Sequence, residues 1–159
     1  MNSRLTASVA LGAAVLLGTT GCAFITPQGT TVQYSPSDGV TIPDSGPLKV
    51  RNALIVSEED GGPGNMIAAV VNETDESHTL HIELGEGASA QEITVRVPAR
   101  SAVSLGNPAG DTPPLEIDAV DGPPGATVPV YFQSGDAEGV LWQVPVLDGA
   151  LDYYGELLP

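Results

Sequence analysis

Apolar residues recur at every second position in short segments along most of the chain after its first 47 residues. This period-two spacing is typical of β-strands, whose side chains point alternately to the two faces of a sheet. In the first such segment the spacing places Leu48, Val50, Leu54 and Val56 on one face. The pattern predicts eight strands: LKVRNALIV (48–56), MIAAVVN (66–72), HTLHIEL (78–84), QEITVRVP (91–98), SAVSL (101–105), LEIDAV (115–120), TVPVYFQ (127–133) and GVLWQVPV (139–146).

Two of these strands are joined by a short turn segment. Residues 135–139, Gly-Asp-Ala-Glu-Gly, separate two apolar runs and predict a β-hairpin. The second run places Trp142 on the face that also carries Val140, Val144 and Val146. We therefore expect Trp142 to be largely buried and to anchor the core.

The segments between the strands are rich in residues that interrupt helices. The chain has 19 Gly and 14 Pro, and many of them fall between the predicted strands. Proline removes a backbone donor and is tolerated at strand ends and edges, whereas it breaks helices. Short strands at this spacing predict an all-β domain over 48–147, either a sandwich or a barrel with antiparallel strands.

The N-terminus has the layout of a bacterial lipoprotein signal. Arg4 precedes an apolar stretch over 5–18, and small residues then lead to Cys22, the only cysteine. The resemblance implies removal of 1–21 and a diacylglyceryl thioether on Cys22, with palmitate-type acyl chains. Thr19 stands where the usual motif has Leu. The alternative is ordinary secretory cleavage after Ala23.

Two segments flank the predicted domain. Residues 22–47 are rich in Ser, Thr, Gly and Pro, which indicates a flexible tether behind the lipidated cysteine. Residues 148–159 form a C-terminal tail that is unusually apolar for an exposed segment. The tail either packs on its own domain or docks onto a partner, and we expect self-packing with part of one aromatic face exposed. Its candidate partner-binding residues are Tyr153, Tyr154, Leu157 and Leu158.

Net charge narrows the classes of partner. The chain carries 5 Lys and Arg against 20 Asp and Glu, a formal charge of −15. Nucleic-acid binding is not expected, because it needs cations that displace counterions from phosphates. Electrostatic docking on anionic lipid is disfavoured for the same reason. The sequence also lacks G-x-S-x-G, H-E-x-x-H and Walker motifs, so no enzymatic activity is expected.

The candidates for metal binding are few. His78 and His81 are the only histidines, and Met66 is the only methionine after Met1. Residues three apart on a strand point to opposite faces, so the two histidines are not expected to clamp one ion. A copper site needs more ligands of this kind than the chain offers. We therefore expect no metal and no cofactor.

Several of these segments resemble one family of small lipoproteins. The Cys22 signal, LKVRNALIV (48–56), IAAVVNET (67–74) and VLWQVPV (140–146) resemble the LpqE-like actinobacterial lipoproteins over about residues 48–146. The resemblance implies an immunoglobulin-like antiparallel β-sandwich of about 7–9 short strands, similar to PCuAC-type copper chaperones. Their His- and Met-rich copper motif is not matched here. Members of the LpqE-like family also occur as peripheral subunits of the actinobacterial respiratory supercomplex of cytochrome bcc and its oxidase.

Two functional hypotheses follow. The first is a non-enzymatic interaction module, anchored by acyl chains on Cys22 to the outer face of the bacterial cell membrane, that serves as an accessory subunit of the respiratory supercomplex. The alternative is a periplasmic copper-handling chaperone of PCuAC-like type with a degenerate metal site. The number of available ligands favours the first.

Overall fold

The computed structural model describes residues 2–19, 34, 36–85, 90–107 and 112–159, which fall into two units, Met1–Tyr34 and Ser35–Pro159. The first unit contains α1 (Asn2–Thr19), which includes the apolar stretch of the expected signal peptide. Among the described residues, no helix has both the length and the apolarity needed to cross a membrane. Cys22, the predicted lipidation site, lies outside the described residues.

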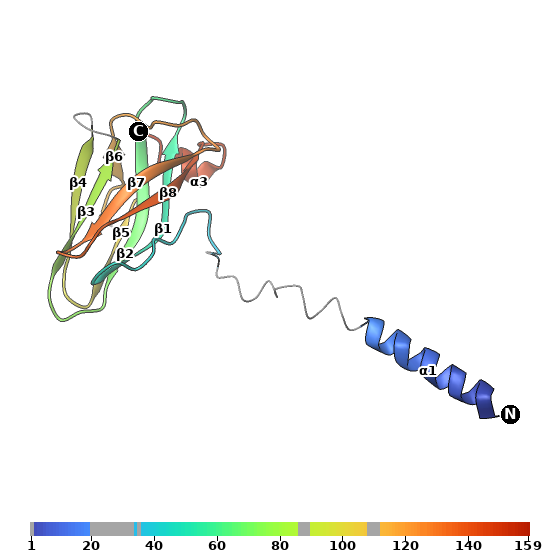
Figure 1. Ribbon diagram of the computed structural model, residues 1–159. Helices are drawn as coiled ribbons and strands as arrows, with labels where there is room; N and C mark the ends of the chain where they lie inside the picture. The colour runs from blue at the N-terminus through green and yellow to red at the C-terminus, as the bar shows by residue number, and fades with distance from the viewer. Residues whose placement is uncertain (1, 20–33, 35, 86–89, 108–111) are drawn as a thin grey trace. The chain divides into compact units, whose positions relative to one another are not determined.

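The second unit is built from strands (Figure 1). They are β1 (Leu48–Ser57), β2 (Gly64–Asn72), β3 (His78–Leu84), β4 (Gln91–Val97), β5 (Ser101–Leu105), β6 (Leu115–Ile117), β7 (Thr127–Ser134) and β8 (Val140–Leu147), followed by the short helix α3 (Asp152–Gly155).

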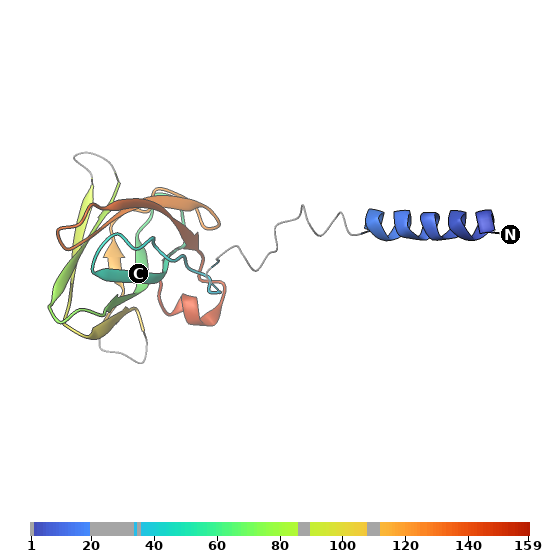
Figure 2. The same ribbon diagram turned by 60° about the horizontal axis from the view of Figure 1, so that its bottom comes forward.

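The strands form two layers that are joined along one side. The order is β4-β3-β7-β8-β1-β2-β5, with β6 paired to β2. Neighbours run antiparallel except β1 and β8, which pair in parallel at Ile55–Val146 and Val56–Leu147. Because β1 pairs with β2 of one layer and with β8 of the other, it joins the two layers. The predicted all-β sandwich is confirmed, with one parallel pair, and Figure 2 shows its strands nearly closed into a ring with α3 outside.

The core lies between the two layers and follows the predicted alternation. On β3 the residues Leu80, Ile82 and Leu84 are buried, and on β7 so are Val128, Val130 and Phe132. The predicted hairpin is present, since β7 and β8 pair with Phe132 opposite Val140. Phe132, 2% exposed, is the largest fully buried side chain of the domain.

The first strand departs from its expected pattern at a β-bulge. The pairing with β2 shifts register between Arg51 and Leu54, and Asn52 has a positive φ of 51°. An extra residue reverses the faces that follow it. Leu48 and Val50 therefore face the main core, whereas Leu54 and Val56 face outward into a second apolar cluster. The expectation that all four share one face is wrong, because strict alternation fails across a bulge.

The segment before β1 is packed on the domain. Val40 pairs with Ala53 of β1, Ile42 is 2% exposed, and the Gly39 N–H donates to Asn52 Oδ1 at 3.0 Å. A Cβ on Gly39 would lie 2.6 Å from the backbone of Asn52, so the close approach requires glycine. The tether expected to extend to residue 47 therefore ends earlier, because Val40 and Ile42 supply apolar contacts that a free linker lacks.

Trp142 is 39% exposed, so the expectation that it is largely buried is wrong. It lies opposite Val130 on the inner face of the hairpin, as the alternation predicts. However, β1 joins β8 only at Val146 and Leu147, so within the described part of the chain no strand pairs with β8 beside Trp142 on that side. Trp142 therefore lies on the inner face of its strand without being buried.

The two aromatic residues of the hairpin should differ in their contribution to stability. We expect Phe132→Ala to lower the free energy of unfolding by about 3–5 kcal/mol, the range for a buried aromatic side chain. Trp142→Ala should cost only about 1–2 kcal/mol, because much of its surface stays in water. Urea denaturation of both variants measures the difference. Equal losses would contradict this placement of Trp142.

Candidate functional site

The three candidate metal ligands are not brought together. His78 and His81 lie on β3 in opposite phase: His78 shares the face of buried Leu80, and His81 is exposed on the other face. Met66 is 0% exposed within the main core. Among the described residues, no three His, Cys, Asp or Glu side chains are grouped closely enough to hold a metal ion.

His81 borders a small polar hollow on the outer face of the β4-β3-β7 layer. The hollow has a volume of about 100 Å³, and Glu83, Glu92, Tyr131 and Gln133 also line it. Glu83 and Glu92 lie directly opposite each other in the β3–β4 register. Two facing carboxylates repel each other across a strand pair, so this surface favours a cationic group rather than an anionic one.

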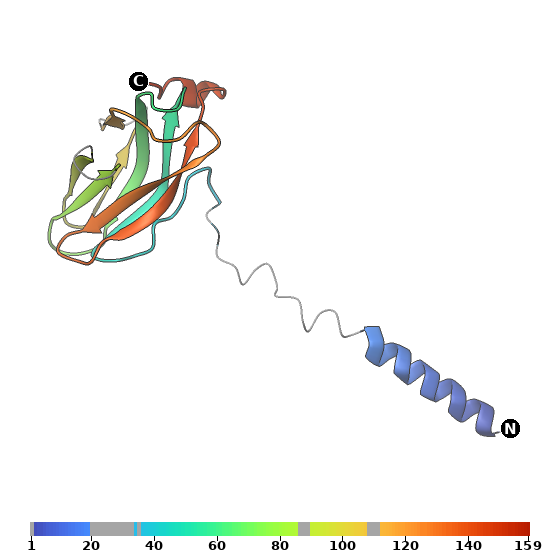
Figure 3. The same cartoon turned by 45° about the horizontal axis from the view of Figure 1, so that its top comes forward.

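The C-terminal tail covers the outward cluster of β1. Tyr154 is 7% exposed and packs with Leu54 and Val56, and Leu157 and Leu158 pack against the same cluster. Figure 3 shows α3 beside the ends of β1 and β8. The Asn65 side-chain amide donates to the Leu157 carbonyl at 2.8 Å, which ties the tail to β2. Three of the four candidate partner-binding residues therefore contact their own domain.

Tyr154 also connects the tail to the segment before β1. Its hydroxyl donates to Asp38 Oδ2 at 2.7 Å. Burial of the phenol raises the pKa of Tyr154 well above its ordinary value, and the hydrogen bond to Asp38 and its negative charge raise that pKa further. Tyr154 therefore stays neutral and remains a donor, so it serves the packing of the tail.

Exposed apolar side chains are present on β8 and on the tail. Leu141 is 62% exposed, Leu151 51% and Tyr153 53%, in addition to Trp142. Sequence reasoning selected Tyr153 but missed Leu141. The missed indication was its position: Leu141 is an apolar residue on the outward-facing phase of its strand, next to a tryptophan.

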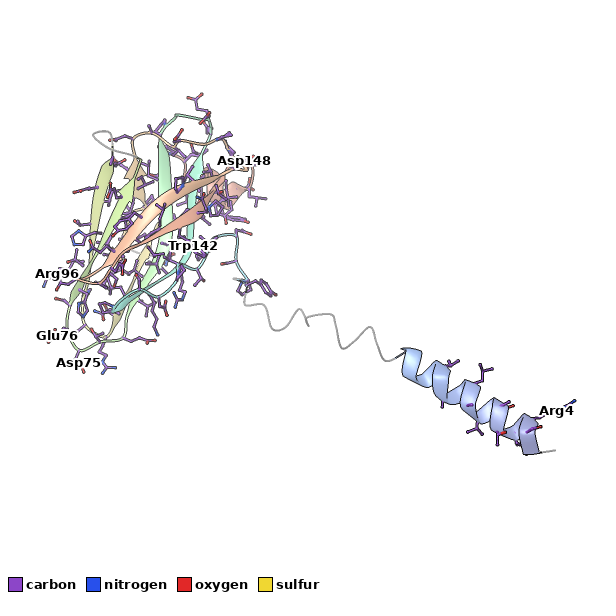
Figure 4. The ribbon with its side chains drawn as sticks, in the orientation of Figure 1. Arg4, Asp75, Glu76, Arg96, Trp142 and Asp148 are labelled. Carbon is purple, nitrogen blue, oxygen red and sulfur yellow. The ribbon has the colours of Figure 1, made fainter. Side chains whose placement is uncertain are left out.

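The charges of the domain are unevenly distributed. Three of its four cations contact the loop that follows β2: Lys49 pairs with Glu73, Arg100 Nε lies 2.8 Å from Asp75 Oδ1, and the Arg96 guanidinium donates to the Ser77 hydroxyl. Figure 4 shows Asp75, Glu76 and Arg96 at one end of the domain and Asp148 at the other. From residue 101 to 159 the chain has no Lys, Arg or His. The hairpin and the tail therefore present acidic charge alone.

Comparison with known proteins shows similarity in fold. No family model matches the sequence, and no curated protein matches it. The solved structure of the apo PmoF2 PCuAC domain is 15% identical with a TM-score of 0.50, covering 68% of this chain and 95% of that one. The copper-bound PCuAC domain from PmoF2 is 14% identical with a TM-score of 0.48, covering 68% and 97%. The sandwich domain is similar in fold to a PCuAC domain. Membership of the LpqE-like family stays a prediction.

Proposed function

We propose that this protein is a lipid-anchored, non-enzymatic interaction module on the outer face of the bacterial cell membrane. The observation that carries the proposal is the exposure of Leu141, Trp142, Leu151 and Tyr153 on an otherwise acidic domain. Aromatic side chains with one exposed face are frequent anchors of protein–protein contacts.

The lipid anchor is argued from the N-terminus. A short basic region, an apolar stretch and then the sole cysteine support acylation at Cys22. Each buried CH₂ contributes about 0.8 kcal/mol, one acyl chain anchors marginally, and two or more anchor stably. A protein held in this way searches for partners in two dimensions, so a small contact surface is sufficient.

The partner in this proposal is a membrane protein complex, specifically the respiratory supercomplex of cytochrome bcc and its oxidase. This assignment comes from the resemblance to LpqE-like lipoproteins over Leu48–Val146. As an accessory subunit the module would bind by its exposed apolar residues and would carry no cofactor of its own.

Co-purification tests this proposal. The tagged full chain is cross-linked in membranes, solubilised in detergent and isolated for mass spectrometry. The matched control is the chain ended after residue 47 with the same tag, because it keeps the signal and Cys22 but lacks the domain. We expect supercomplex subunits to be enriched at least tenfold over this control. Equal recovery with both chains would contradict the proposal.

Copper handling is the second candidate, because the sandwich domain is similar in fold to the apo PmoF2 PCuAC domain. The residues of this chain argue against it. His78 and His81 lie on opposite faces of β3, and Met66 is enclosed in the core, so the candidate ligands do not meet.

A binding measurement separates the two candidates. We expect the Cys22→Ala chain, which has no thiol, to bind Cu(I) no more tightly than an unstructured peptide with two histidines. Competition with a chromophoric Cu(I) chelator measures the affinity, and His81→Ala serves as the comparison. Stoichiometric copper that survives a strong chelator would instead support a chaperone.

A further inference from the structure

The short helix α3 carries apolar side chains that its own domain leaves uncovered. Leu151, directly before the helix, is 51% exposed, and Tyr153, within it, is 53% exposed. Both lie among acidic residues of the tail that are also exposed. We call this group the α3 surface, and it consists of Asp148, Leu151, Asp152, Tyr153 and Glu156.

Tyr153 is held in place at this surface by its neighbour. The centroids of the Tyr153 and Tyr154 rings lie 4.4 Å apart. Tyr154 is 7% exposed, and its hydroxyl donates to Asp38, so the ring beneath Tyr153 is fixed. A side chain that already rests against a fixed ring loses less conformational entropy when a partner covers it. Exposed aromatic side chains of this kind are frequent anchors of protein–protein contacts.

The carboxylates of the α3 surface are not neutralised within the described part of the chain. Asp148, Asp152 and Glu156 are exposed, and no ion pair among the described residues includes any of them. Asp152 and Glu156 are four residues apart, and the Glu156 N–H donates to the Asp152 carbonyl. At this spacing on a helix, like charges repel each other. A bound cation would relieve that repulsion.

The cations of the chain itself are engaged elsewhere. The chain has five Lys and Arg. Lys49, Arg51 and Arg100 form ion pairs with residues outside the tail. Arg96 contacts the loop after β2, and Arg4 lies in α1. A second copy of the chain brings the same formal charge of −15. A partner of complementary charge is therefore a different molecule that carries its own cations.

The position of α3 beside the tether indicates where that partner lies. Because Tyr154 bonds to Asp38, the chain enters the domain next to α3. The 16 residues 22–37 precede Asp38, and at about 3.3–3.6 Å per residue they span at most about 55 Å. With Cys22 acylated as proposed, Asp38 and the helix in contact with it stay within roughly this distance of the bilayer. The surface is thus available to proteins that are themselves held in the membrane.

We propose that the α3 surface binds a segment with Lys or Arg beside an apolar residue, in the external part of a membrane-embedded protein. The apolar residue contacts Leu151 and Tyr153, and the cations lie beside the three carboxylates. The inference rests on the proposed role as a lipid-anchored interaction module, and it names the surface and the kind of partner segment. An anionic lipid surface does not fit, because the carboxylates repel it.

Site-specific photo-cross-linking in membranes tests the proposal on the full chain. Tyr153 is replaced by p-benzoylphenylalanine, which keeps an aromatic ring at the surface, and the adducts formed on irradiation are identified by mass spectrometry. The position control carries the same group at Thr94, an exposed residue of β4.

Two further chains with the photoreactive group at position 153 test the charge argument. One also carries Asp152→Asn and Glu156→Gln, and the other carries Glu83→Gln and Glu92→Gln on the outer face of β3 and β4. Both lose two carboxylates, so they have the same net charge and differ only in where the charge is removed.

We expect adducts at position 153 with Lys- or Arg-containing segments in the external parts of membrane proteins. Their yield should fall about fivefold or more when Asp152 and Glu156 are neutralised, because complementary charge promotes association, and should stay unchanged when Glu83 and Glu92 are neutralised. Adducts mainly with lipid or with a second copy of the chain would overturn the choice of partner. A yield no higher than at Thr94, or an equal fall with both pairs of substitutions, would overturn the assignment to α3.

The outcome is separable from that of the proposed function. If supercomplex subunits co-purify but position 153 forms no adducts with them, the α3 proposal fails alone. If adducts form with basic segments of other membrane proteins and no supercomplex subunit co-purifies, the supercomplex role fails and the α3 proposal stands.

Discussion

Replacing Cys22 by Ala is expected to remove the protein from the membrane fraction or to leave it as an unprocessed precursor. The acyl chains on Cys22 would supply the whole of the anchoring free energy, because a chain with a formal charge of −15 gains nothing from anionic lipid. We therefore expect a loss of essentially all membrane-bound mature protein. Fractionation with intact-mass measurement, and labelling with a palmitate analogue, provide the readout.

The neighbouring Ala23→Ser variant is the matched control, since it changes a small residue beside the cysteine and should keep its lipid. Ordinary secretory cleavage, the alternative to lipidation, predicts a different product. Cleavage after Ala23 would release the wild-type chain as a soluble protein that begins at Phe24. Mature Cys22→Ala protein that remains in the membrane would show that something other than acylation holds it there.

Alternation of apolar residues predicted the strands well, because most of them bury only one face. Leu80, Ile82 and Leu84 on β3, and Val95 and Val97 on β4, are buried as their phase requires. The Gly-rich turn at 135–139 likewise predicted the β7–β8 hairpin. These features depend on local sequence, so they can be derived without knowledge of the tertiary structure.

Features that depend on which strands become neighbours could not be derived in this way. The bulge at Asn52 turns Leu54 and Val56 outward, where the tail, together with Ile67 and Leu147, covers them. Trp142 has the alternation phase of a core residue, yet it is partly exposed because β1 pairs with β8 only further along the strand, at Val146 and Leu147. The parallel pairing of β1 with β8 cannot be predicted from the spacing of apolar residues in either strand.

The same limit applies to the candidate site. Phase alone separated His78 from His81, and the structure places them as expected on opposite faces. The burial of Met66 follows instead from the position of β2 between other strands of its layer, and the exposure of Leu141 follows from its place on the outer face of β8. A large apolar residue on the outward-facing phase of a strand is therefore the more informative sign of a contact surface in this chain.

Deleting residues 152–159 is expected to destabilise the domain strongly. The deletion removes Tyr154, Leu157 and Leu158, and it exposes Leu54 and Val56, which are now 0% exposed. Burial of a large apolar side chain contributes about 1.5–3 kcal/mol. With Leu157 and Leu158 only half-buried, the expected loss is about 3–6 kcal/mol, a large part of the roughly 5–15 kcal/mol available to a small domain.

Such a loss should lower the melting temperature by on the order of 10 °C or more, or abolish folding. Tyr153→Ala is the matched control, because Tyr153 lies in the same helix but is 53% exposed, and it should melt close to wild type. Tyr154→Phe keeps the ring in the cluster and removes only the hydrogen bond to Asp38, so its effect should be intermediate. Thermal melting followed by circular dichroism compares the three chains. A truncated chain that melts at the wild-type temperature would show that the tail does not stabilise the sandwich, and Tyr154, Leu157 and Leu158 would then return as candidates for a partner contact.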